Sequence, residues 1–233
     1  MESSEMNNIL KQQIDYYEAR APEYDDWYYR RGRYDWGIEK NLDWANEADE
    51  IRRHFHEFRG FDDTLELASG TGVWTAELLK TSKRVTCLDA SPKMIELNRS
   101  KNGCKKIDFQ RVDLFQWEPD HTFDLVFTSF WLSHIPRDQL HRFLKNIAGA
   151  MKPDGLFYFI DSQLARTSRA QNHEAPEVDT GFSHRKLNDG REFEIVKIFH
   201  GREDLTRQLS EAGLKADVKT TDNYFLYGTA ARC

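Results

Sequence analysis

Two glycines and a carboxylate stand where a parallel sheet would bind a nucleotide-like ligand. Gly70 and Gly72 follow the apolar run 64–68, and Asp89 ends the apolar run 84–88. A glycine turn after a first strand lets a ligand approach the backbone. A carboxylate at the end of the next strand, about twenty residues on, can accept hydrogen bonds from ribose hydroxyls. These residues predict a nucleotide-type pocket at the start of an α/β domain.

The elements that must position this pocket alternate between strands and helices. The predicted strands of the core cover 64–68, 84–88, 106–112, 123–128 and 156–160, and the helices cover 72–80, 92–100 and 137–151. Near-continuous apolar strands separated by helices predict a parallel sheet with helices on both faces. A helix over 202–212 is followed by strands at 214–221 and 224–230, which are close enough in sequence to pair antiparallel.

Two further segments are predicted to cover the pocket. Residues 1–40 are expected to form an N-terminal helical lid with a bend at Pro22, followed by a helix over 41–59. Residues 161–200 are polar and irregular and then form a β-hairpin, which is typical of a binding loop. The predicted organisation is therefore a lid, a ligand-binding domain over 41–233, and an insertion within it that covers the substrate.

Composition limits the partners of this chain. It has 33 basic and 39 acidic residues, a net charge of −6, and no basic stripe, so nucleic acid is not an expected partner. No apolar run approaches the roughly 20 residues of a membrane span. Three cysteines fit no disulfide framework and no metal spacing, which favours a reducing, cytoplasmic location. A monomer or a homodimer is expected.

The first glycine turn resembles a known family motif. The pattern Glu66-x-Ala68-x-Gly70-x-Gly72 resembles motif I of the class I S-adenosylmethionine-dependent methyltransferases, Asp/Glu-x-Gly-x-Gly-x-Gly, with Ala68 in place of the first glycine. The resemblance implies a Rossmann-like, seven-stranded, mostly parallel sheet with antiparallel final strands. A nicotinamide oxidoreductase is disfavoured, because the third glycine of its fingerprint is replaced by Thr75.

The N-terminal segment adds to the resemblance. Residues 15–25 resemble the Tyr-x(3–4)-Ala-x-x-Tyr-Asp lead-in of the small-molecule and quinone-type branch, which folds over the cofactor. Tyr24 would then contact the methionyl carboxylate, Arg20 is a second candidate for that contact, and Tyr16 or Tyr17 would close the pocket. Alternatively, these tyrosines belong to an aromatic helix that packs on the sheet edge.

The resemblance implies S-adenosylmethionine as cofactor and S-adenosylhomocysteine as product. Asp89 would bind the ribose, Ala90, Met94 and Leu114 would lie on the adenine, and Asp113 would accept a hydrogen bond from its amino group. Met94 could instead be ordinary core, and Asp113 could cap a loop. The complete set of expected cofactor-binding residues is Tyr24, Glu66, Ala68, Gly70, Gly72, Asp89, Ala90, Met94, Asp113, Leu114 and Phe130.

The reacting edge is expected at the carboxyl end of the fourth strand, in residues 128–136. His134 is the candidate base, because an unperturbed imidazole pKa near 6.5 suits proton removal at neutral pH; a structural histidine is the alternative. No metal is predicted, since Asp161 has no acidic partner in this segment. The expected substrate-binding residues are Tyr16, Tyr17, Trp131, His134 and Arg185.

The function predicted from these residues is methyl transfer from S-adenosylmethionine to an oxygen or nitrogen atom, with carbon also possible, of a small-molecule metabolite. The alternative hypothesis is a catalytically inactive protein of the same fold that binds the cofactor or a partner without turnover. The replacement at Ala68 keeps this alternative open.

Overall fold

A seven-stranded sheet forms the centre of the molecule. The computed structural model describes residues 3–173 and 180–233. The strand order is β3-β2-β1-β4-β5-β9-β8, with β9 antiparallel to both of its neighbours and the other pairs parallel. This confirms the predicted sheet with antiparallel final strands. The strands are β1 Phe61–Leu67, β2 Ser82–Asp89, β3 Ile107–Arg111, β4 Phe123–Ser129, β5 Met151–Ser162, β8 Leu214–Thr220 and β9 Phe225–Arg232.

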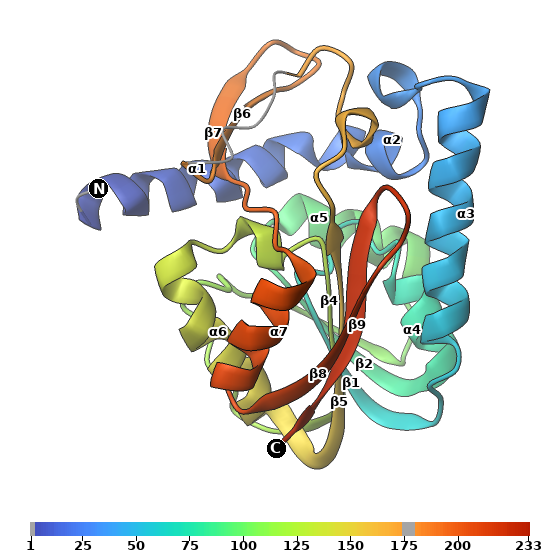
Figure 1. Cartoon of the computed structure of the whole chain (residues 1–233), viewed down its shortest axis with the longest axis vertical. Coiled ribbons are helices and arrows are strands. Elements are labelled where there is room, and N and C mark those ends of the chain that lie inside the picture. Colours follow the sequence, from blue (N-terminus) through green and yellow to red (C-terminus); the bar gives the residue numbers. More distant parts are fainter. Residues whose placement is uncertain (1–2, 174–179) are drawn as a thin grey trace.

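Helices cover both faces of this sheet (Figure 1). They are α3 Ile38–Phe55, α4 Thr75–Thr81, α5 Pro92–Asn102, α6 Arg137–Ala150 and α7 Arg202–Glu211. Neighbouring residues of a strand point to opposite faces. Phe127 and Tyr158 therefore pack in the core under α3 and α4, whereas Val126, Phe157 and Phe159 pack in the core under α6 and α7. Alternating large side chains thus supply two separate cores.

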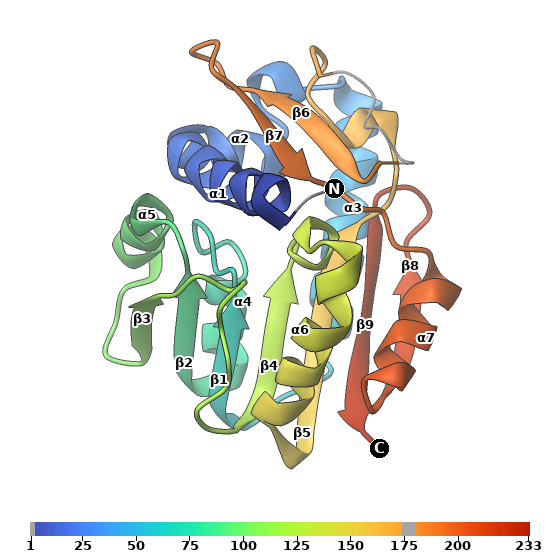
Figure 2. The ribbon, with the colours of Figure 1, turned by 90° about the vertical axis from the view of Figure 1, so that its left-hand side faces the viewer.

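A helical segment and a hairpin lie across the carboxyl ends of the parallel strands (Figure 2). The helical segment contains α1 Ser3–Arg20, the 3-10 turn η1 Ala21–Glu23 and α2 Tyr24–Tyr28. Pro22 lies in the first turn of η1, so the predicted bend is confirmed. The hairpin consists of β6 Phe182–Lys186 and β7 Glu192–Val196. The remaining 3-10 turns are η2 Gly32–Tyr34, η3 Leu132–His134 and η4 Arg166–Ser168.

The α1 helix is attached to the hairpin by both apolar and polar contacts. The Tyr16 ring lies 5.6 Å from the Phe193 ring. The Gln13 amide accepts a hydrogen bond from the Val196 backbone N–H at 3.0 Å and donates one to the His134 carbonyl at 3.0 Å. One buried glutamine therefore joins α1, β7 and η3, and fixes the height of the helix above the sheet.

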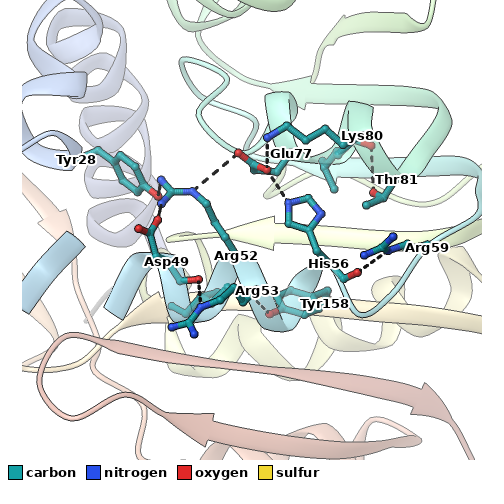
Figure 3. Close-up of polar contacts among 12 residues, drawn as sticks. Tyr28, Asp49, Arg52, Arg53, His56, Arg59, Glu77, Lys80, Thr81 and Tyr158 are labelled. Atoms are coloured by element: carbon teal, nitrogen blue, oxygen red, sulfur yellow. Dashed lines mark hydrogen bonds and ion pairs between the residues drawn. The ribbon is translucent and has the colours of Figure 1, made fainter. Parts of the chain in front are cut away.

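A polar network fixes α2 and α3 against α4 (Figure 3). The His56 Nε2 atom lies 2.8 Å from the Glu77 carboxylate, and Lys80 Nζ lies 2.7 Å from the same carboxylate. Arg52 of α3 donates a hydrogen bond to the Tyr28 hydroxyl at 2.8 Å. These contacts tie the end of the N-terminal segment to the helix that follows the glycine turn.

Among the described residues, no helix is both long and apolar enough to cross a membrane.

The turn between β8 and β9 is attached to α3 by one buried carboxylate. Glu47 accepts hydrogen bonds from the Tyr224 backbone N–H at 2.8 Å and from the Asn223 side-chain amide at 2.7 Å, and also from the Thr221 hydroxyl. Glu47 is only 7% exposed, so water cannot replace these bonds.

We expect Glu47→Ala to lower the free energy of unfolding by about 2–4 kcal/mol, because several buried donors lose their acceptor. Asn46→Ala, at an exposed position of the same helix, is the matched control and should change stability by less than about 0.5 kcal/mol. Urea denaturation of both variants measures the difference. Equal stabilities would show that Glu47 does not hold the β8–β9 turn.

Candidate functional site

The loop after β1 has an unusual backbone that a carboxylate holds in place. Ala68, Gly70 and Gly72 have φ values of 55°, 52° and 85°, in the left-handed region that glycine favours. Ala68 therefore keeps the backbone conformation expected of a glycine, at a cost of about 1 kcal/mol. The Gly70 N–H donates to Asp89 Oδ2 at 2.8 Å, and the Ser91 N–H donates to Asp89 Oδ1 at 2.9 Å. Asp89 thus joins the loops that follow β1 and β2.

Burial makes the Asp89 carboxylate a strong acceptor. Only 9% of the residue is exposed. Burial raises the pKa of Asp89 to about 6, and the hydrogen bonds from the backbone N–H groups of Ser91, Gly70 and Ala90 limit that rise. At neutral pH the Asp89 carboxyl group is therefore mostly ionised, and little water reaches it.

A first cavity of about 600 Å³ opens beside this carboxylate. Its walls combine apolar side chains with the two strand-end carboxylates Asp89 and Asp113. The predicted cofactor-binding residues that line it are Tyr24, Ala68, Gly70, Asp89, Ala90, Met94, Asp113, Leu114 and Phe130, and it is also lined by Gln13, Ile14, Ser91, Phe115 and Ser129.

Two of the predicted cofactor-binding residues, Glu66 and Gly72, do not line this cavity. A Cβ atom on Gly72 would lie 2.2 Å from Asn98 Oδ1, so packing against α5 accounts for this glycine. Glu66 is 1% exposed and accepts a hydrogen bond from the Thr75 hydroxyl at 2.6 Å. Burial raises the pKa of Glu66 to about 8. Both residues hold the loop from behind, and the motif alone could not show on which side of the loop they lie.

A second cavity, of about 550 Å³, is lined by residues of α1, of the hairpin and of the ends of β4 and β5. Four predicted substrate residues line it, namely Tyr16, Tyr17, His134 and Arg185. The fifth, Trp131, lines the first cavity instead, where its ring lies 5.2 Å from the Phe115 ring. The other residues that line the second cavity are Arg20, Tyr24, Trp27, Tyr34, Phe130, Ser162, Ser168, Arg169, His173, Lys197 and Phe199.

The two cavities adjoin at three aromatic side chains. Tyr17, Tyr24 and Phe130 line both of them. Tyr17 and Tyr24 come from the N-terminal segment, and their rings are 6.3 Å apart. Phe130 follows β4 and has a φ of 57°, which is uncommon for a bulky residue. An aromatic boundary therefore separates an acidic cavity from a cavity that contains cations.

His134 lies in the second cavity with both ring nitrogens in hydrogen-bonding contact. Nε2 lies 2.7 Å from the Tyr17 hydroxyl, and Nδ1 lies 2.7 Å from the Val196 carbonyl oxygen. A carbonyl only accepts, so we assign the proton to Nδ1 and the acceptor role toward Tyr17 to Nε2. Burial, and then the nearby Lys197 ammonium, hold the pKa of His134 well below its usual range. The ring is therefore neutral, and burial also raises the pKa of Tyr17 well above its usual value.

Lys197 is a component of the second cavity that the sequence analysis did not identify. It is 6% exposed, and its Nζ donates a hydrogen bond to the Ser133 hydroxyl at 2.7 Å. The available signal was a lysine within the apolar run 195–198. A charged residue at a predicted core position commonly marks a binding site.

Asp161, which the sequence analysis places after the fifth strand, lies inside the end of β5 and takes part in local hydrogen bonds. It accepts from the Ser133 N–H at 2.9 Å and from the Ser162 N–H at 2.7 Å, and lies 3.7 Å from Lys197 Nζ. Within the described part of the chain, no group of three or more His, Cys, Asp or Glu residues is placed to hold a metal ion.

Comparison with known proteins identifies the fold around these cavities. The family model described as a methyltransferase domain matches residues 64–155. A solved structure of DhpI in complex with SAH is 33% identical, with a TM-score of 0.76, and the match covers 96% of this chain and 97% of that chain. The DhpI–SAM–HEP complex is 36% identical and has the same TM-score of 0.76. That match covers 95% of this chain and 97% of that chain.

Curated sequences agree over a shorter region. Demethylmenaquinone methyltransferase of Tropheryma whipplei is 30% identical over 102 residues, and phosphoethanolamine N-methyltransferase 1 of Triticum aestivum is 30% identical over 103 residues. These matches cover 40% and 42% of this chain, and only 39% and 21% of the respective relatives. Since the chain matches the DhpI structures over nearly their whole length, it belongs to the class I S-adenosylmethionine-dependent methyltransferase family.

Proposed function

We propose that this protein transfers a methyl group from S-adenosylmethionine to an oxygen or nitrogen atom, with carbon as a further option, of a small-molecule metabolite. The observation that carries the proposal is the aromatic boundary of Tyr17, Tyr24 and Phe130 between two adjoining cavities. A methyl donor and a methyl acceptor need separate pockets that meet where the group is transferred. The second cavity is lined by side chains of α1, the hairpin and the ends of β4 and β5, which supports a small molecule as the acceptor.

The first cavity has the donor set that the cofactor requires. When bound, S-adenosylmethionine supplies an electrophilic methyl group on a sulfonium sulfur. Asp89 would accept hydrogen bonds from the ribose hydroxyls, each worth about 1.5–3 kcal/mol with a charged acceptor. Met94 and Leu114 would pack on the adenine, and Asp113 would accept from its amino group. Their positions in the first cavity support these roles.

The aromatic boundary would position the reacting groups and exclude water. Ring faces near a cationic sulfur attract it by about 0.5–2 kcal/mol each. Alignment of the acceptor atom, the methyl carbon and the sulfur can contribute on the order of 7–11 kcal/mol to catalysis. Tyr17 and Tyr24 belong to the N-terminal segment, so we infer that residues 1–40 act as a lid and that the insertion 161–200 completes the acceptor pocket.

The lid is attached to the cofactor-binding loops by two carboxylates. Glu18 accepts hydrogen bonds from the Ser91 hydroxyl and, at 3.1 Å, from the Lys93 backbone N–H. Asp25 accepts one from the Thr71 hydroxyl and pairs with Lys101. These contacts support a lid that organises the cofactor site as well as the acceptor site.

We propose that His134 acts on the methyl acceptor through the Tyr17 hydroxyl. The Tyr17 hydroxyl donates to His134 Nε2, so its oxygen is free to accept a hydrogen bond from an O–H or N–H group of the acceptor. A proton leaving the acceptor would then pass to the Tyr17 oxygen, while the Tyr17 proton passes to Nε2. The Val196 carbonyl keeps the ring oriented throughout. His134 is thus proposed as the final proton acceptor.

Methyl transfer is tested with labelled S-adenosylmethionine and a panel of small acids, alcohols and amines. We expect label in one class of acceptor and binding of S-adenosylhomocysteine by calorimetry. Asp89→Asn should weaken that binding about 10- to 100-fold, since a charged acceptor is lost. Asp154→Asn, at an exposed position, is the control and should bind as the wild type does. Binding without any transfer would favour the inactive alternative, and no binding would refute the proposal.

The proton path gives a second test. His134→Asn should lower kcat about 100-fold, while the Kd of S-adenosylhomocysteine changes less than about 2-fold, because the ring does not line the first cavity. His121→Asn, at an exposed position, is the control and should leave kcat unchanged. A wild-type kcat in His134→Asn at every pH would show that the histidine is only structural.

A further inference from the structure

Among the residues that the structure describes, those that line the second cavity carry an excess of positive charge. The basic residues among them are Arg20, Arg169, Arg185 and Lys197. No Asp or Glu is present among the described lining residues. Arg20 and Arg185 are each 9% exposed, and Lys197 is 6% exposed. Buried cations are unfavourable unless they are paired or well hydrogen-bonded. A cluster of them therefore suggests a bound anion.

The described hydrogen-bond partner of Arg185 is a neutral ring. Arg185 Nη1 contacts His173 Nδ1 at 3.4 Å, and His173 Nε2 lies 3.1 Å from the Lys186 carbonyl oxygen. The carbonyl only accepts, so we assign the His173 proton to Nε2, which leaves Nδ1 as the acceptor for Arg185. Burial, and then Arg185, lower the pKa of His173 to about 4, so this ring adds no charge and cannot balance one.

The charge of Arg20 is surrounded by rings. Its guanidinium carbon lies 4.8 Å from the centre of the Tyr24 ring and 5.6 Å from that of Tyr16, and Nη2 donates to the Tyr34 hydroxyl at 3.4 Å. Its Nε and the Tyr16 hydroxyl have no hydrogen-bond partner among the described residues. Tyr24 lines both cavities, and Arg20 lies against its ring. A carboxylate of the cofactor bound beside Tyr24 would therefore balance the charge of Arg20.

That leaves Arg185 and Lys197 with one carboxylate between them. Asp161 lies 3.7 Å from Lys197 Nζ, and it also accepts two backbone hydrogen bonds. Among the described residues, no carboxylate contacts Arg185. Glu174, Glu177 and Asp179 lie outside the described residues. Among the described residues, Asp161 is thus the one carboxylate beside these two buried cations, and a further negative group would balance the second charge.

We propose that the methyl acceptor carries a compact oxyanion, a carboxylate or a tetrahedral oxyanion of the phosphate type, and that Arg185 and Lys197 bind it with Tyr16 as a further donor. This inference rests on the proposed function and names the class of its substrate. The oxyanion anchors the acceptor at the hairpin, and the rest of the molecule extends toward Tyr17 and Phe130, where the two cavities meet.

The test uses protein loaded with S-adenosylhomocysteine, so that the carboxylate of the cofactor is already in place. Sulfate and acetate are titrated separately by calorimetry, because their charges are constant between pH 7 and 9 and their shapes distinguish a tetrahedral from a planar site. We expect at least one of them to bind, and Arg185→Gln and Lys197→Met each to weaken that binding at least 10-fold. Arg191→Gln, at an exposed position of the same hairpin paired to Asp189, should bind as the wild type does.

A pH series gives a readout that a structural role would not produce. Burial lowers the pKa of Lys197 to about 8; Asp161 opposes this shift, Arg185 and Arg20 add to it, and the neighbouring His134 is neutral. Anion affinity should therefore fall as the pH rises through about 8. This fall should be absent in Lys197→Met.

The outcomes separate this inference from the proposed function. If neither sulfate nor acetate binds the loaded protein, or if Arg185→Gln and Lys197→Met bind them as Arg191→Gln does, the inference is overturned. Label transfer to an uncharged acceptor by that same protein would leave the proposed function intact. Failure to bind S-adenosylhomocysteine would remove both.

Discussion

The hydrogen bonds of Asp89 are the interaction on which the ligand-binding architecture depends. Two parallel strands end side by side, and the loops that leave them have no regular pairing of their own. The carboxylate accepts one backbone N–H from each loop, at 2.8 and 2.9 Å, and so holds the left-handed turn at Gly70 next to the start of α5. The same carboxylate lines the first cavity, where we propose that it binds the ribose.

The second constraint is the attachment of the N-terminal segment above that edge. A sheet and its helices would leave the carboxyl ends of the strands open to water. Here α1 is joined to β7 through Gln13 and to the loop before α5 through Glu18. This brings Tyr17 and Tyr24 over Phe130 and divides one crevice into an acidic and a cationic part. The difference in charge between the two parts suits a donor with a cationic sulfur on one side and an anionic acceptor on the other.

Sequence patterns could predict the residues whose positions depend on local structure. Asp89 is the last residue of β2 and Asp113 lies two residues after β3. Residues at the carboxyl end of a parallel strand lie at the edge of the sheet where ligands bind. Patterns could not show that Gly72 and Glu66 face away from the first cavity. Gly72 packs against Asn98 of α5, and Glu66 accepts a hydrogen bond from Thr75 of α4. The replacement Ala68 also proved compatible with the expected backbone, with a φ of 55°.

The second cavity was less accessible to sequence analysis, since residues far apart in the chain form it. Arg20, Arg185 and Lys197 come from α1, β6 and the segment after β7, and only their joint burial makes their charge informative. His134 was identified from its position after β4, but its proton state follows from Tyr17 and Val196, which no spacing rule connects to it. The cationic character of the second cavity thus became visible only when residues far apart in the chain were seen buried together.

We propose that the methyl donor lies in the first cavity with its sulfur at the boundary of Tyr17, Tyr24 and Phe130. A crystal structure of the protein with S-adenosylhomocysteine tests this most directly. We expect both ribose hydroxyls to lie within hydrogen-bonding distance of Asp89 and the sulfur to face the second cavity. A ribose bound away from Asp89, or a sulfur that faces solvent with the second cavity closed off, would contradict it.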